Sequence, residues 1–138
     1  MPPRPAPSAR STARTLHSFL IASTLIVSAG AGVAARSTGR LQTGFAPVDW
    51  AGVLLALAAL PLYAVLRGRL PARRETETPD AWWQTHLGRA VLLWTLLELA
   101  AMLGATALLT TGYPAGFAVL AILALGGLLT YSPARLAR

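Results

Sequence analysis

Hydrophobic residues gather in four long runs that are separated by short polar segments. The runs extend over residues 16–35, 50–66, 90–109 and 113–131. An α-helix needs about 20 residues to cross a hydrocarbon core of about 30 Å, and spans of about 17 to 25 residues occur. Strands of a membrane barrel alternate polar and apolar residues, whereas these runs are apolar on all sides. The pattern therefore predicts an all-α fold, an integral membrane antiparallel four-helix bundle.

Polar segments at both ends of the chain predict tails. Residues 1–15 contain four prolines and three arginines but no acidic residue, a composition that buries too little apolar surface to fold. We expect a flexible cytoplasmic tail there, a four-span domain over residues 16–131, and a second cytoplasmic tail at residues 132–138.

The N-terminal part also has the features of a targeting segment. A basic start, an apolar centre and the small residues Val33 and Ala35 match a cleavable secretory signal, whose removal would leave three spans. A mitochondrial transit peptide is a further alternative, because the first acidic residue is Asp49.

Aromatic residues stand at the ends of several runs. Trp50 opens the second run, Trp82 and Trp83 precede the third, and Tyr113 and Tyr131 bracket the fourth. Tryptophan and tyrosine favour the headgroup level of a bilayer. We therefore expect "PDAWWQTHLGR" to form a short interfacial helix ahead of the third span.

Composition and charge support a membrane location. The chain is 54% hydrophobic and only 12% charged, whereas soluble domains contain about 25% charged residues. All twelve basic residues are arginine, and ten of them lie in the two tails and the segment 67–89. The positive-inside rule places these three segments in the cytoplasm, and Arg36 and Arg40 outside. This pattern indicates a lipid bilayer as partner and no nucleic acid. The lysine-free, alanine-rich composition indicates a multi-pass protein of a bacterial cytoplasmic (inner) membrane.

Glu98 is the exceptional residue, because it lies near the middle of the third run. An ionised group at that depth costs about 2.5 to 3.5 kcal/mol on insertion scales. Helical spacing places Ala101 and Ala105 on its face, and this small-xxx-small pair favours close approach of another helix. Gly30 and Gly32 offer a similar packing surface on the first span. Glu98 is therefore expected to face protein, and its candidate hydrogen-bond partners are Thr24, Ser23, Tyr63 and Thr95.

Two roles for Glu98 remain open at this point. A protonated carboxyl can hold helices together by a hydrogen bond worth about 0.6 to 2 kcal/mol. Alternatively, intramembrane carboxylates mark ion pathways and proton relays. The first role needs a dry, neutral group, and the second needs a group that titrates and is reached by water.

Other chemistry has little support in the sequence. The chain has no cysteine, which excludes thiolate metal sites and disulfides. It has no P-loop, HExxH motif or nucleophile elbow, so we expect no enzyme, no cofactor and no metal site. His17 and His86 fall near the cytoplasmic interface, where interfacial anchoring is favoured over a two-histidine metal site.

The segment 89–135 resembles small four-span bacterial membrane proteins of unknown function. In those proteins one glutamate of the third helix precedes a "TG" turn, and the last helix ends near a proline; Glu98, Thr111, Gly112 and Pro133 match. The chain is also similar to small multidrug resistance transporters in its four helices and single membrane glutamate, which lies in the first helix there. It is similar to rotor proteolipids of rotary ATPases in "SAGAGVA".

Together these observations predict a non-enzymatic structural or accessory component that acts through helix–helix contacts, in a homo-oligomer or a larger membrane complex. The alternative is a small proton-coupled transporter or ion-translocating subunit that uses Glu98.

Overall fold

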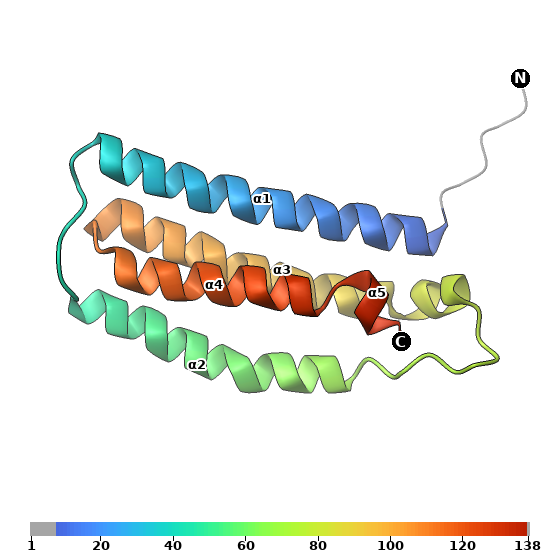
Figure 1. Cartoon of the computed structure of the whole chain (residues 1–138). Coiled ribbons are helices and arrows are strands. Elements are labelled where there is room, and N and C mark those ends of the chain that lie inside the picture. The colour runs from blue at the N-terminus through green and yellow to red at the C-terminus, as the bar shows by residue number, and fades with distance from the viewer. Residues whose placement is uncertain (1–7, 138) are drawn as a thin grey trace, which may run out of the picture.

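The computed structural model describes residues 8–137, and in this range its helices are joined by loops and there is no strand. Each of the four long helices runs antiparallel to the one before it in the chain (Figure 1), so the chain enters and leaves the bundle at the same end. A short fifth helix packs across that end. The bounds are α1 Ala9–Ser37, α2 Pro47–Gly68, α3 Pro79–Thr111, α4 Pro114–Thr130 and α5 Pro133–Leu136. The predicted all-α antiparallel bundle is confirmed.

Three of the helices, α1, α2 and α3, are long and apolar enough to cross a membrane. The fourth, α4, is equally apolar but has only 17 residues. At a rise of 1.5 Å per residue it extends over about 26 Å, which is at the short end of what a span requires. The helices fit a membrane protein.

The first helix begins earlier than the sequence pattern predicts. Ser8 is its N-cap, and the Ser8 side chain accepts a hydrogen bond from the Ser11 backbone N–H at 3.3 Å. Residues 9–15, expected in a flexible tail, thus form the first two turns of α1, and Ala13 is fully buried there. The capping serine and the tertiary contact outweigh the polar composition. The rest of the expected tail, residues 1–7, lies outside the described residues.

The expected interfacial helix before the third span is not a separate element. Thr78 caps α3, Pro79 occupies its first turn, and the helix then continues without a break for 33 residues. Trp82 and Trp83 are 0% and 1% exposed, so they belong to the core and not to an exposed aromatic belt. Leu70, α1 and α5 pack around them and cover their rings.

The third helix is the centre of the bundle. It packs against α1 and α4 over most of its length, and α2 packs mainly on α4. Gly104 and Gly127 permit the close approach of α3 and α4, because a Cβ at either position would press on Leu120 or Leu97 of the facing helix. The helix ends at Gly112, whose φ of 80° is a left-handed conformation that favours glycine.

Candidate functional site

Glu98 lies at the edge of the buried face of α3. On one side of it Trp94, Ala101 and Ala105 are buried, and on the other side Thr95 is exposed. Glu98 itself is half-buried. The carboxyl therefore stands where the contact surface of this helix meets the outside of the bundle.

None of the four expected partners forms a hydrogen bond with Glu98. The Tyr63 hydroxyl donates to the Leu96 carbonyl at 3.2 Å, and Thr95 is exposed. Thr24 is fully buried, but its hydroxyl has no hydrogen-bond partner among residues 8–137, and Ser23 is half-buried on the same helix. The intrachain hydrogen bond expected for Glu98 is thus absent from the part of the chain that the structure describes. Nor does Glu98 line any of five cavities among these residues.

The small residues near Glu98 behave differently on the two helices. Ala101 and Ala105 of α3 are 0% and 4% exposed, and Ala105 packs with Ala31 and Ala35 of α1. Gly30 and Gly32 were the expected packing residues of α1, but a Cβ added at either would meet nothing within 4 Å. Ala31 and Ala35 face the core because they fall four residues apart along one face of the helix, whereas the glycines fall beside that buried stripe.

Asp49 is a buried polar residue that the sequence pattern identified only as the first acidic residue of the chain. It is 1% exposed and lies in the first turn of α2. Its Oδ2 accepts from the Ala46 backbone N–H at 2.9 Å, and its Oδ1 accepts from the Gly116 backbone N–H at 2.6 Å. One carboxylate therefore satisfies free amides at the start of two helices, α2 and α4.

Two glycines make this junction close. A Cβ at Gly52 would lie 3.0 Å from the Gly116 Cα, and a Cβ at Gly116 would lie 3.0 Å from the Asp49 Cα. The pattern "APVD" gives a local signal for a capped helix start, since proline and an acidic residue are both favoured there. The contact with Gly116 has no local signal, because the two residues are 67 positions apart.

The other end of α4 is held by side chains of α1 and α3. His17 Nε2 lies 2.8 Å from the Leu128 carbonyl oxygen, and Trp94 Nε1 donates to the Tyr131 carbonyl at 2.7 Å. Because a carbonyl only accepts, the Nε2 of His17 must carry a proton. The last carbonyls of a helix have no partner within it, so these two rings satisfy groups that hydrocarbon would leave unpaired.

The two histidines take part in a row of aromatic rings. His17 contacts Trp94, Trp94 contacts Trp83, Trp83 contacts Trp82, and Trp82 contacts His86, with centroid distances of 4.9, 6.0, 4.9 and 4.8 Å. His17 is 6% exposed, so it is a core residue and not an interfacial anchor. Among residues 8–137, no three His, Asp or Glu side chains come together as they would to hold a metal ion.

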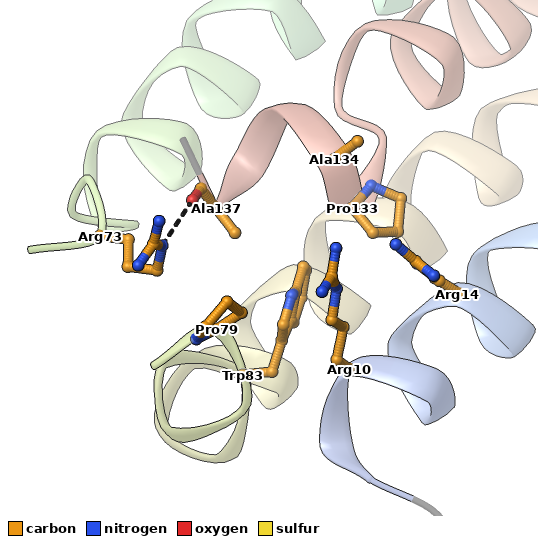
Figure 2. A pocket seen from close by; sticks show the side chains of 8 residues that line it. All are labelled: Arg10, Arg14, Arg73, Pro79, Trp83, Pro133, Ala134 and Ala137. Atoms are coloured by element: carbon orange, nitrogen blue, oxygen red, sulfur yellow. Dashed lines mark hydrogen bonds between the residues drawn. The ribbon is translucent and has the colours of Figure 1, made fainter. Parts of the chain in front are cut away.

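Three arginines that the sequence analysis used only for orientation meet at the same end. Arg10, Arg14 and Arg73 line one cavity together with Trp83 and α5 (Figure 2). They come from α1 and from the α2–α3 loop. Only the folded chain brings them together.

In comparisons with known proteins, the chain matches no family model, no curated protein and no solved structure. The resemblance of residues 89–135 to four-span bacterial proteins therefore rests on Glu98, Thr111, Gly112 and Pro133 alone. In the structure Gly112 closes α3 and Pro133 opens α5, which fits that outline.

Proposed function

We propose that this chain is a non-enzymatic structural or accessory component of a bacterial inner membrane. It spans the membrane four times with both termini in the cytoplasm, and it acts by binding a helix of another membrane subunit along the edge of α3 that carries Glu98. The four long helices α1 to α4 and the concentration of arginines at one end of the bundle support this orientation.

The observation that carries the proposal is the contrast between Glu98 and four other polar side chains of the bundle. Asp49, His17, Trp94 and Tyr63 each bond to a backbone group of a neighbouring segment. Glu98 has no such bond within residues 8–137, so it contributes nothing to this bundle that would offset its desolvation. A partner helix that accepts a hydrogen bond from its protonated carboxyl supplies the missing contribution, worth about 0.6 to 2 kcal/mol.

Photo-cross-linking in native membranes tests this proposal. A photoreactive amino acid replaces Thr95, beside Glu98, and in a matched control it replaces Ile122 of α4, which is 71% exposed. We expect a defined protein adduct, with a second copy of this chain or with another subunit, only at position 95. The adduct should persist in Glu98→Gln, whose amide still donates, and should disappear in Glu98→Ala.

An infrared pH titration of the same protein in bilayers tests the alternative role of Glu98. If the Glu98 carboxyl band, identified by Glu98→Gln, ionises reversibly near neutral pH, the contact role fails and a proton-coupled transporter is favoured. An adduct at position 95 that does not depend on residue 98 would also contradict the proposal.

A further inference from the structure

The end of the bundle where α1 begins and α5 lies contains a cavity of about 120 Å³. Figure 2 shows the guanidinium groups of Arg10 and Arg14 pointing into the space beneath α5, while Arg73 approaches from the opposite side. Trp83 and Pro79 form one wall, and Pro133 forms another. The volume is several times what one water molecule needs, so a phosphate group fits.

Among the described residues, the lining of this cavity carries three positive charges and no carboxylate. Asp80 is close by, but its Oδ1 accepts from the Arg10 backbone N–H at 3.1 Å, not from the guanidinium. Arg73 donates to the backbone carbonyls of Glu77 and Ala137 at 2.6 and 3.4 Å. Within residues 8–137 the Arg10 and Arg14 guanidinium groups form no hydrogen bond, so their donors are free for an anion.

The cavity lies along the helices at the outer boundary of the headgroup layer of a bilayer. Arg10 precedes the apolar run of α1 by six residues, and Trp83 precedes the apolar run of α3 by seven. At 1.5 Å per residue, both lie about 9 to 10 Å beyond the start of the apolar segments. Headgroups extend roughly 5 to 8 Å beyond the hydrocarbon on each side, so the backbone at these positions lies just outside that layer. A long arginine side chain can extend its guanidinium group back to the lipid phosphates at this boundary.

We propose that this arginine cavity binds a phosphate group, as presented by the headgroup of an anionic phospholipid or by free phosphate. Guanidinium groups pair with phosphate through two parallel N–H···O bonds, and basic pockets between membrane helices suit anionic headgroups. Donors from α1 and from the α2–α3 loop meet on one anion, which bridges two segments that are distant in sequence. This site is independent of Glu98 and of the proposed function.

Lipid binding to the purified full chain, measured by native mass spectrometry from detergent, tests the site. The probes are phosphatidylglycerol and phosphatidylcholine of the same acyl chains. We expect wild-type protein to bind phosphatidylglycerol about tenfold more tightly, and Arg10→Gln/Arg14→Gln to lose most of that preference. The charge-matched control is Arg74→Gln/Arg135→Gln, which changes two exposed arginines that do not line the cavity.

Inorganic phosphate separates the two sources of the ligand. If millimolar phosphate raises the unfolding temperature of wild type but not of Arg10→Gln/Arg14→Gln, the site takes the free anion; if only phosphatidylglycerol does so, it takes the lipid. An equal loss of preference in the control variant would overturn the proposal, as would binding of neither anion. Should the double variant not fold, Arg14→Gln against Arg135→Gln gives the same comparison.

Discussion

The two ends of α4 present the same physical problem and receive different solutions. At its start, the Asp49 carboxylate accepts from Gly116 at 2.6 Å in a junction closed by glycines. At its end, the rings of His17 and Trp94 form hydrogen bonds with the backbone carbonyls of Leu128 and Tyr131. A charged acceptor makes the stronger bonds, whereas the rings add a large packed surface. The comparison shows that a helix of only 17 residues depends on its neighbours at both ends.

The largest effect is expected at the carboxylate end. Asp49→Ala leaves two buried amides without acceptors and should lower the free energy of unfolding by about 3 to 5 kcal/mol, since each charge-assisted bond contributes about 1.5 to 3 kcal/mol. Denaturant titration in mixed micelles, followed by circular dichroism, measures this. The control Asp80→Ala, whose contact with Arg10 is exposed, should cost less than about 1 kcal/mol. Equal losses in the two variants would show that the Asp49 carboxylate contributes no more to stability than an exposed one.

Glycine packing at the same junction gives the next test. Gly116→Ala forces a Cβ against the Asp49 backbone at 3.0 Å, and overpacking of this kind costs about 1 to 3 kcal/mol. In the matched control Gly126→Ala, on the same helix, the added Cβ meets nothing within 4 Å. That variant should be neutral or up to about 1 kcal/mol more stable, because alanine favours helix. Thermal unfolding of both variants decides whether the close approach is required.

Removal of one hydrogen bond at the other end of α4, where His17 and Trp94 bind, should lower the free energy of unfolding by less. Trp94→Phe keeps most of the ring but removes the donor to Tyr131, and we expect a loss of about 1 to 2 kcal/mol. Trp50→Phe is the control, because Trp50 is 61% exposed and forms no side-chain hydrogen bond within residues 8–137. A loss at Trp94 no larger than at Trp50 would show that packing, and not the hydrogen bond, holds this end of α4.

The smallest effect on the isolated chain is expected at Glu98. Its carboxyl has no hydrogen bond in the described residues, so Glu98→Gln should change the free energy of unfolding by less than about 0.5 kcal/mol, as surface substitutions usually do. The measurement is the same denaturant titration at protein concentrations that keep the chain monomeric. A loss as large as that of Trp94→Phe would mean that Glu98 holds the bundle itself together.

Hydropathy was sufficient for the helices but not for their ends. The four apolar runs predicted α1 to α4, because apolar length sets what can span a membrane. The N-caps Ser8 and Thr78 place the starts of α1 and α3 before those apolar runs. A hydropathy pattern does not detect such caps, because it measures only how apolar each residue is. A hydropathy pattern also does not show tertiary contacts. Trp82 and Trp83 were therefore predicted to lie at an interface, although contact with other segments buries their rings.

The sequence by itself determined that this chain forms long apolar helices, that its arginines concentrate at one end, and that Glu98 is exceptional. Only the tertiary structure decided which polar side chain meets which backbone group. Asp49 and Gly116 are 67 positions apart, and His17 and Leu128 are 111 apart, so no local pattern encodes either contact. The arginine cavity follows the same rule. Its charges were countable from the sequence, but their meeting depends on how α1, the α2–α3 loop and α5 pack together, because long-range packing, not local preference, fixes distances between such segments.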